Sequence, residues 1–341
     1  MEIYHQFPDS HDHTSLRGCS LALGNFDGVH LGHQALFREA KRHGRAAALT
    51  FDPHPGKVLQ PQLAPQLITL LPRKLELFSQ FELDAAIVLP FSRQYAHTTH
   101  ENFEAALFDL VNARHIVVGH DFTYGAARAG TVDTLRKAGA KRGAEIHEIS
   151  PVTVDGVVAS SSRVREYLLE GRMGAVRRLL GRFFDLDGTV VRGEGRGQGV
   201  GFPTANVETL NELRPASGVY AVRLAVIPDG KLVASNPWVW RDGAANIGVK
   251  PTFGGEHVSI EVHVLDFSDN LYDQRVRVEF IRRIRPEHRF GSVGELTAQI
   301  ERDVQNVREG LHAPTLEFLD TPGSGLFDDL HVWSSRGTAD P

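Results

Sequence analysis

Short apolar runs alternate with amphipathic segments between Gly18 and about residue 150, and this alternation is the strongest constraint on the fold. Five runs have the length and composition of buried strands: Ser20–Leu23, Ala46–Phe51, Ala85–Leu89, His115–Gly119 and Glu145–Ile149. The segments between them carry apolar residues at helical spacing: His30–Arg42, Pro72–Phe81, His100–Val111 and Val132–Arg142. Strands that alternate with helices of this length predict a parallel, doubly wound α/β sheet, which binds its ligands at the carboxyl ends of its strands.

The pattern changes in the second half of the chain. Two short helices are predicted at Ser162–Glu170 and Met173–Leu180, the first of them ended by Gly171. Apolar and polar residues then alternate with a period of two in three segments: Val219–Val226, Val258–Leu265 and Val276–Ile281. This period predicts an antiparallel β domain, which we expect to close into a small barrel because closure removes exposed edges.

A last helix is predicted from Ser292 onward. Ser292 and Glu295 have the spacing of a capping box. An apolar stripe follows at helical spacing: Leu296, Ile300, Val304 and Val307. We expect this stripe to pack against the barrel.

The chain has 341 residues, enough for two domains that each bury a core of their own. Its formal net charge of -5 does not indicate a nucleic-acid partner, since proteins that bind nucleic acids are usually basic. No apolar run approaches a membrane span and no signal pattern opens the chain, so we expect a cytoplasmic protein with no membrane partner. A single cysteine, Cys19, fits a reducing compartment. The sequence gives no indication of oligomeric state.

The changes of pattern divide the chain into four expected segments. These are a polar leader at 1–17, an α/β domain at 18–181, a barrel domain at 182–311 and a loosely ordered tail at 312–341. His11 and His13 in the leader are interpreted as solvated side chains rather than as metal ligands.

The loop after the first strand, Gly-Asn-Phe-Asp-Gly at 24–28, leads into a helix that carries His30 and His33 in its first turn. Residues three apart on a helix share a face, and the unpaired N–H groups of a helix start favour anions. We therefore predict a triphosphate site in which the two histidines stabilise departing pyrophosphate. Two surface histidines are the alternative interpretation, which the preceding strand and loop disfavour.

The hydroxyls and guanidiniums at the start of the helix after residue 159 form a second candidate phosphate site. An ordinary serine N-cap with solvated arginines is the alternative there. The residues of this domain that we assign to ATP binding are Gly24, Asn25, Asp27, Ser160, Ser161, Ser162 and Arg165.

Aromatic and charged side chains follow two further strands at the edge where ligands are expected. Phe51 and Asp52 end the second strand, while Asp121, Tyr124 and Arg128 follow the fourth. Phe51 and Tyr124 can stack on a flat ring or belong to the core, and the sequence favours neither interpretation.

The run GEGRGQGVGFPTAN at 193–206 is the most informative stretch of the second domain. Glycines this dense can wrap phosphates with backbone N–H groups, although a Gly-rich surface turn is the default interpretation of the composition alone. The glycines that we assign to ATP binding are Gly195, Gly199 and Gly201. Thr204 and Asn206 offer hard oxygen ligands of the kind that Mg²⁺ prefers.

The preceding segment, Phe184–Val190, looks like the aspartyl nucleophile motif of haloacid dehalogenase phosphatases. That chemistry needs an α/β core after the motif, whereas the following residues alternate as in antiparallel strands. We therefore interpret the segment as a first barrel strand that carries two surface aspartates, Asp185 and Asp187.

Four motifs of the first half, in this order, closely resemble the adenylyltransferase domain of the bifunctional prokaryotic riboflavin kinase/FAD synthetases: GNFDGVHLGH, TFDPHP, VVGHDFTYG and SSSRVREYLLEG. In the second half, GFPTAN, ANIGVKPTF and EVHVLDF resemble the kinase domain of the same family. The resemblance implies an HxGH nucleotidyltransferase domain of doubly wound α/β fold followed by an antiparallel flavokinase barrel. It also implies that ATP and Mg²⁺ serve phosphorylation of riboflavin to FMN and then transfer of AMP to FMN, giving FAD and pyrophosphate.

The same resemblance implies roles for individual residues. Glu261 corresponds to the candidate base for the ribityl hydroxyl, although an exposed strand glutamate is the interpretation that its position alone favours. The flavin-binding residues that the resemblance implies are Phe51, Asp52, Asp121, Tyr124 and Arg128. Asp273 departs from the family pattern, in which glycine is common at this turn.

Two alternatives remain at this point. One is a different HxGH nucleotidyltransferase with an accessory β domain, which flavin binding would distinguish. The other is a non-catalytic flavin-binding protein that keeps the scaffold, which turnover would distinguish.

Overall fold

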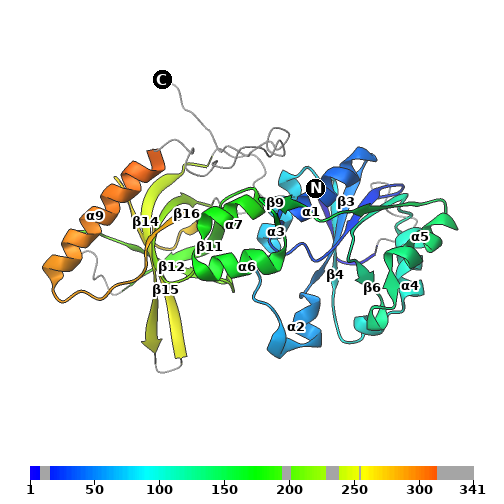
Figure 1. The fold of residues 1–341 in the computed structure, drawn as a ribbon, viewed down its shortest axis with the longest axis horizontal. Coiled ribbons are helices and arrows are strands. Elements are labelled where there is room, and N and C mark those ends of the chain that lie inside the picture. Colours follow the sequence, from blue (N-terminus) through cyan, green and yellow to red (C-terminus); the bar gives the residue numbers. More distant parts are fainter. Residues whose placement is uncertain (8–15, 194–200, 228–237, 253–254, 313–341) are drawn as a thin grey trace, which may run out of the picture. The chain divides into compact units, whose positions relative to one another are not determined.

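A computed structural model describes residues 1–7, 16–193, 201–227, 238–252 and 255–312 (Figure 1). The chain divides into two compact units, Met1–Ser161 and a second that begins at Ser162. His11, His13, Gly195, Gly199 and the tail from residue 313 onward lie outside the described residues. In the described ranges, no helix is both long and apolar enough to cross a lipid bilayer.

The first unit is built on a parallel sheet of six strands in the order β1-β4-β3-β2-β5-β8. The strands are β1 (Glu2–Tyr4), β2 (Ser20–Leu23), β3 (Ala46–Asp52), β4 (Ala85–Pro90), β5 (His115–Gly119) and β8 (Glu145–Ile149). Every neighbouring pair is parallel, so the predicted α/β sheet is confirmed together with all five predicted strands. The central β2 is buried at every position, as expected for a strand covered on both faces.

Helices cover both faces of this sheet and create two apolar cores. The main helices are α1 (Leu31–Arg42), α2 (Pro55–Leu59), α3 (Leu71–Gln80), α4 (His100–Ala105) with the π-turn η3 (Ala106–Leu110), and α5 (Val132–Ala140). One core gathers around Phe37 of α1 and Phe78 of α3, and the other around Phe103 and Leu135. Short elements complete the unit: η1 (Pro61–Leu63), η2 (Tyr95–His97), β6 (Thr123–Tyr124), η4 (Ala126–Arg128), β7 (Gly130–Thr131), β9 (Thr153–Val154) and β10 (Val157–Val158).

The start of the chain corrects the expectation of a solvated polar leader at 1–17. Residues Glu2–Tyr4 form β1, which pairs in parallel with β4 at the edge of the sheet. Leu16, at the other end of this segment, is buried in a core of the first unit. Three residues are too few for a periodic pattern, so β1 cannot be predicted from sequence without knowledge of its pairing with β4.

The second unit contains a closed barrel of six strands in the order β11-β12-β15-β14-β13-β16, which confirms the predicted barrel. The strands are β11 (Phe184–Val191), β12 (Ala205–Thr209), β13 (Gly218–Val226), β14 (Arg241–Thr252), β15 (Gly255–Val264) and β16 (Arg275–Arg285). All pairs are antiparallel, and β16 closes the barrel by pairing with β11. The turn before β16 holds Asp273 at φ 63°, a left-handed conformation that glycine adopts more easily.

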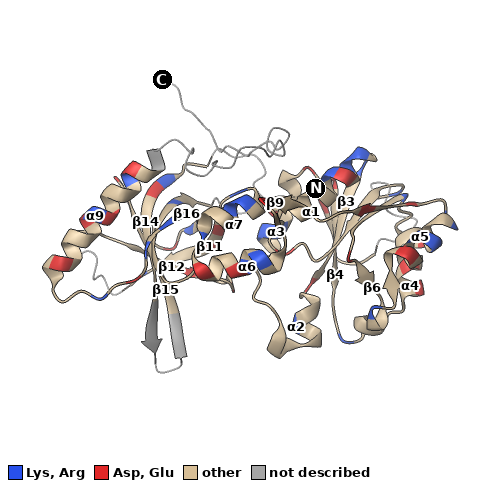
Figure 2. Cartoon of the chain, in the orientation of Figure 1, with Lys and Arg blue, Asp and Glu red and all other residues tan. Residues whose placement is uncertain are grey.

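The last helix, α9 (Val293–His312), packs against this barrel as predicted. The Ser292 hydroxyl accepts a hydrogen bond from the Glu295 amide at 3.2 Å, and the Glu295 carboxylate accepts one from the Gly291 amide. Val307 is fully buried against Ala221 and Leu265. Acidic and basic side chains are interspersed along α9 rather than gathered by sign (Figure 2).

The aspartates of β11 are not the two surface side chains that we expected. Asp185 is buried, and Asp187 accepts two hydrogen bonds from the Arg277 guanidinium, at 2.5 and 2.7 Å. Since β11 belongs to an antiparallel barrel, the phosphatase-like motif carries no α/β core after it. Asp187 is a structural ion-pair partner.

The helices α6 (Ser161–Glu170) and α7 (Met173–Leu180) precede the barrel, and we expected both to belong to the first domain. In the structure α7 contacts β16 and β11. Four of its apolar side chains are buried: Met173, Val176, Leu179 and Leu180. We therefore propose that the barrel domain includes these helices.

This proposal predicts a difference between two fragments. A fragment of residues 162–312 should be several kcal/mol more stable than one of residues 182–312, because burying each large apolar side chain contributes about 1.5–3 kcal/mol. Urea unfolding followed by circular dichroism measures both. Equal unfolding midpoints for the two fragments would show that α6 and α7 do not stabilise the barrel, and would contradict the proposal.

Candidate active sites

The loop between β2 and α1 has an unusual backbone that is fixed by burial. Phe26 and Val29 adopt positive φ values of 50° and 45°, which are sterically unfavourable, above all for a β-branched residue. Both side chains are fully buried, and the Phe26 ring lies 4.9 Å from Phe37 and 5.6 Å from Phe78 between centroids. Core packing therefore holds the loop in one shape.

This loop delivers His30 and His33 to the start of α1. Their rings stack with centroids 3.6 Å apart and planes inclined by 25°. His30 is the N-cap residue and makes no side-chain capping hydrogen bond. A Cβ at Gly32 would lie 3.0 Å from the His30 ring and 3.2 Å from the carbonyl oxygen of Ala159, so only glycine fits here without a shift. The structure thus brings the two predicted histidines together at a helix start.

His33 is closely surrounded by protein although part of its surface is open to solvent. Burial, with the positive charges of His30 and Lys74 beside it, holds the pKa of His33 well below its ordinary value. The imidazole is therefore neutral near pH 7 in the free protein. It can act as a hydrogen-bond donor that gains charge only when an anion arrives.

Sequence reasoning missed Lys74, a buried lysine on α3. Its ammonium donates a hydrogen bond of 2.8 Å to the carbonyl oxygen of Asn25. Burial lowers the pKa of Lys74, while Asp27 and Asp52 act in the opposite direction. From sequence alone, a lysine on an amphipathic helix is interpreted as a solvated side chain. Only the fold shows that Lys74 faces the loop between β2 and α1.

Asp27, which we predicted to bind ATP, has a structural role in this loop. Its carboxylate is buried and accepts hydrogen bonds from the amides of Ile68 and Thr69, at 3.1–3.2 Å. These contacts fix the segment before α3, and the assignment of Asp27 to ATP binding stays a prediction. Asn25 keeps an exposed side chain, and Gly24 donates its amide to Leu49 at 3.1 Å.

The serine cluster reaches this loop through Ser161, whose hydroxyl donates a hydrogen bond of 2.8 Å to the Asp27 carbonyl oxygen. Ser160 precedes α6 and is half-buried. Ser162 and Arg165 lie on α6 itself, the former exposed and the latter half-buried. Their assignment to ATP binding stays a prediction.

An aromatic group lies where β3 and β4 end. The ring centroid of Phe51 is 5.4 Å from that of Phe91 and 5.7 Å from that of Tyr95. Burial raises the pKa of Tyr95, whose buried hydroxyl has no hydrogen-bond partner among the described residues. Asp52 is exposed beside this group. Phe91 and Tyr95 are therefore candidates that the sequence motifs did not indicate.

Tyr124 belongs to the core, one of the two interpretations that the sequence left open, and its flavin-binding role stays a prediction. Its side chain is buried against Phe103, and its hydroxyl donates a hydrogen bond of 2.5 Å to Glu104. Asp121 and Arg128 are exposed, and the Arg128 guanidinium donates to the Thr123 hydroxyl.

In the barrel, three polar residues form one row across neighbouring strands. Glu261 of β15 lies directly opposite Asn206 of β12 and Asn246 of β14. Directly opposed residues point to the same face of a sheet, so the base and metal candidates share a face. Gly193 lies against the Asn206 amide, so a larger residue there would displace that side chain. Asn246 was not among the predicted residues.

Thr204 and Gly201 approach this row from the segment before β12. Thr204 is half-buried and Gly201, at φ +87°, is exposed. The neighbouring Pro203 carbonyl oxygen lies 2.8 Å from Nδ1 of His263, on the same strand as Glu261. This contact holds the GFPTAN segment against β15.

Comparisons with known proteins match a different family model to each half of the chain. A family model described as FAD synthetase matches residues 12–163, and one described as riboflavin kinase matches residues 180–311. Two bifunctional riboflavin kinase/FMN adenylyltransferases are similar over most of their length. That of Escherichia coli K12 is 36% identical over 87% of this chain and 95% of the relative, and that of Bacillus subtilis 168 is 36% identical over 84% and 90%.

A crystal structure of a macrolide-efflux protein from Streptococcus pneumoniae has the same two-part fold. It aligns with a TM-score of 0.78 and 29% identity, over 90% of this chain and 99% of that chain. The relatives, the two family models and the placement of the motifs agree. The chain belongs to the bifunctional riboflavin kinase/FMN adenylyltransferase family.

Proposed function

We propose that this protein acts in FAD biosynthesis and that its two units carry separate steps. The barrel unit phosphorylates riboflavin with ATP to give FMN, and the α/β unit transfers AMP from a second ATP to FMN, giving FAD and pyrophosphate. The observation that supports this most strongly is the match of one family model to each unit, with the HxGH pair in one and the Asn206–Glu261–Asn246 row in the other. The same family match supports a cytoplasmic location.

In the α/β unit, an FMN phosphate oxygen attacks the α-phosphorus of ATP and the bond to the bridging oxygen breaks. Negative charge then grows on the departing pyrophosphate. The stacked His30 and His33 and the N–H groups at the start of α1 lie together, so they can stabilise that charge. FMN phosphate is already ionised, and this step needs no general base. Lys74 fixes the loop that positions the histidines.

In the barrel, the ribityl hydroxyl attacks the γ-phosphorus of ATP and must lose its proton. Glu261 is the carboxylate on the row, so we assign it as the proton acceptor. Asn206, directly opposite Glu261, and Thr204, two residues earlier in the chain, offer neutral oxygens, a donor set that fits Mg²⁺. Bound Mg²⁺ would neutralise charge on the phosphates of ATP.

His33→Ala should slow FAD formation from FMN by about 10²–10³-fold, the usual effect of losing one electrostatic contact to the transition state. Riboflavin phosphorylation should be unchanged, since it belongs to the other unit. Separation of the flavins after incubation with ATP measures both rates, with the exposed His97→Ala as the matched control. An unaltered FMN-to-FAD rate would remove His33 from the mechanism.

Thr204→Val should raise the Mg²⁺ concentration needed for half-maximal riboflavin phosphorylation by on the order of tenfold, which corresponds to about 1.4 kcal/mol for a lost oxygen ligand. The wild type should be inactive after chelation and recover when Mg²⁺ is returned. Phosphorylation in metal-free buffer would contradict the assigned role of the Thr204–Asn206 pair.

Glu261→Gln should slow the conversion of riboflavin to FMN by about 10²–10⁴-fold, because the amide cannot accept the hydroxyl proton. Supplied with FMN, the variant should still make FAD at the wild-type rate. Glu208→Gln, an exposed glutamate on β12, is the control. If the variant phosphorylates riboflavin at the wild-type rate, Glu261 is not the proton acceptor. If it also fails with FMN, its role is structural.

A further inference from the structure

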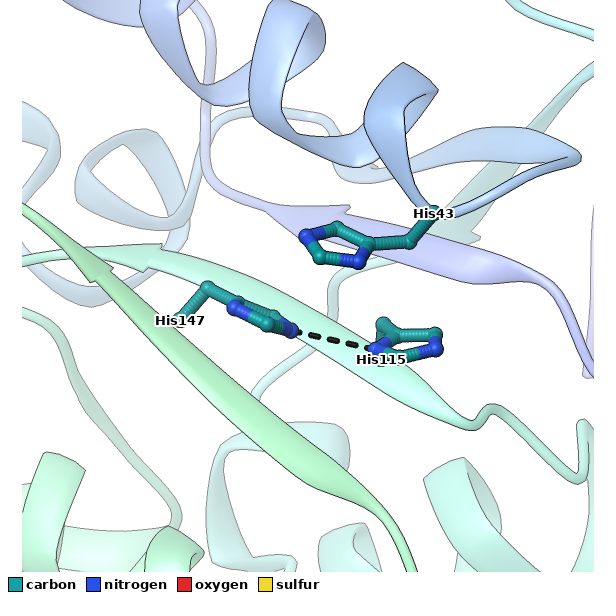
Figure 3. Close-up of side chains that lie close together, drawn as sticks. All are labelled: His43, His115 and His147. Atoms are coloured by element: carbon teal, nitrogen blue, oxygen red, sulfur yellow. Dashed lines mark hydrogen bonds between the residues drawn. The ribbon is translucent and has the colours of Figure 1, made fainter.

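Three histidines converge at the amino ends of the sheet strands (Figure 3). The loop between β2 and α1, which carries His30, lies at the opposite, carboxyl ends. His43 is the C-cap residue of α1, His115 opens β5, and His147 lies on the edge strand β8. The helix α1 begins beside the catalytic loop and is 12 residues long, so its two ends are about 18 Å apart. The cluster is therefore a site distinct from the His30–His33 pair.

The three side chains have the spacing that a small metal ion requires. One ring nitrogen from each lies within 4.8 Å of the others, and His115 Nδ1 and His147 Nε2 share a hydrogen bond of 3.1 Å, whose proton a bound ion would replace. Two nitrogen ligands of one tetrahedral Zn²⁺ are about 3.3 Å apart, given Zn–N distances of about 2.0–2.1 Å. No other convergent group of three His, Cys, Asp or Glu occurs in the part of the chain that the structure describes.

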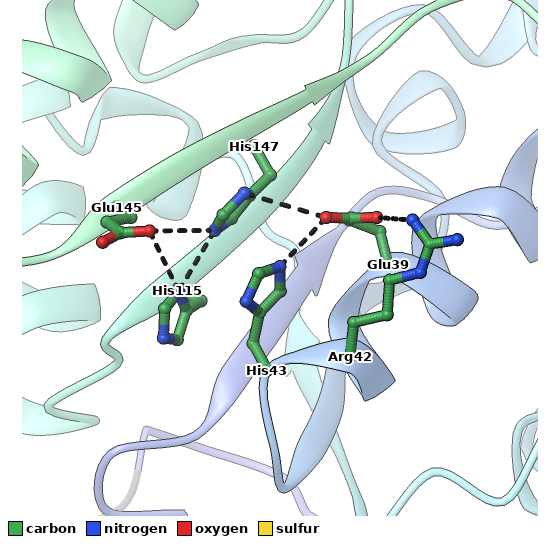
Figure 4. A network of polar contacts seen from close by, with 6 residues as sticks. All are labelled: Glu39, Arg42, His43, His115, Glu145 and His147. Atoms are coloured by element: carbon green, nitrogen blue, oxygen red, sulfur yellow. Dashed lines mark hydrogen bonds and ion pairs between the residues drawn. The ribbon is translucent and has the colours of Figure 1, made fainter.

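Glu39 selects which nitrogens remain for a metal (Figure 4). Its Oε1 atom is 2.9 Å from Nε2 of His43 and 3.9 Å from Nδ1 of His147. The opposite nitrogens, Nδ1 of His43 and Nε2 of His147, are left on the side of His115. Arg42 holds the other oxygen of Glu39 at 2.9 Å. A carboxylate on the far nitrogen of a ligand histidine is the usual partner that orients such a ligand.

Glu145 supplies a fourth group on the metal-facing side. Its Oε2 atom is 3.7 Å from Nδ1 of His115 and 3.8 Å from Nε2 of His147, the two nitrogens that already approach each other. The carboxylate is largely exposed at the sheet edge. Three imidazoles and one carboxylate make a complete tetrahedral set.

The three imidazoles pack closely together and are partly shielded from solvent. The His43 ring stacks on His115 at 4.4 Å and on His147 at 4.1 Å, and each side chain is only 19–24% exposed. Three protonated rings at this spacing would repel one another. A divalent ion between neutral rings would instead attract the Glu145 carboxylate, while Arg42 already balances the charge of Glu39.

We propose that His43, His115 and His147 bind a divalent transition-metal ion, with Glu145 as fourth ligand and Glu39 as the residue that orients two of the imidazoles. Zn²⁺ is the ion that this ligand set fits best, because imidazole nitrogens select it over Mg²⁺ and Ca²⁺. The ion would tie the end of α1 to β5 and to the edge strand. The site is structural and independent of the proposed flavin chemistry.

The test uses the full chain after chelator treatment and dialysis, titrated with ZnCl₂ in a calorimeter. We expect one equivalent with a Kd below about 10 µM, a range typical of specific rather than incidental binding. The His115→Gln and His147→Gln variants should bind more than about 100-fold more weakly, and Glu39→Gln about 10–100-fold more weakly, the usual effect of removing an orienting partner. His97→Gln should bind as the wild type does.

Two further measurements keep the proposal open to refutation if a variant fails to fold. Wild-type protein loaded with Co²⁺ should show the intense visible bands of a four-coordinate site, and ZnCl₂ should raise the unfolding temperature of the wild type. His33→Gln should retain the bound equivalent, which separates this site from the catalytic pair. Absence of binding to the folded wild type, octahedral Co²⁺ bands, or loss of binding in His33→Gln alone would overturn the proposal.

Discussion

Burial of Phe26 beneath the loop after β2 is the interaction on which the first unit depends. Its ring fills the space between α1 and α3, and its edge meets the His33 ring at a centroid distance of 5.3 Å. Core packing and the placement of the His33 ring therefore depend on the same contact. The positive φ values of this loop cost energy of order 1–3 kcal/mol each, and the surrounding core offsets them.

The barrel positions its polar groups by a different means. There the register of β12, β15 and β14 aligns Asn206, Glu261 and Asn246, while the apolar residues that alternate with them fill the core. A slip of one residue would exchange the two faces and bury the polar row. Closure of the barrel fixes the register at every strand, so the fold itself specifies which side chains share a face.

Periodicity predicted most of the fold, because both halves have cores that impose strong patterns. The five long strands of the sheet, the barrel and the α9 stripe on Val307 follow from it, and His30 and His33 follow from their place in a strand–loop–helix sequence. What it could not predict depends on tertiary neighbours. The short β1 has no period, Lys74 is buried only because α3 faces the loop, and Tyr124 is a core residue because Glu104 and Phe103 surround it.

The helix α1 is anchored at both ends, at the N-cap residue His30 and at the C-cap residue His43. One inserted residue would turn everything after it by about 100° around the helix axis. Phe37 and Ala40, which are buried, would then face solvent, and His43 would leave the edge of the sheet. We therefore expect α1 to tolerate side-chain changes on its outer face but no insertion or deletion. Its length of twelve residues sets the distance between His30 and His43.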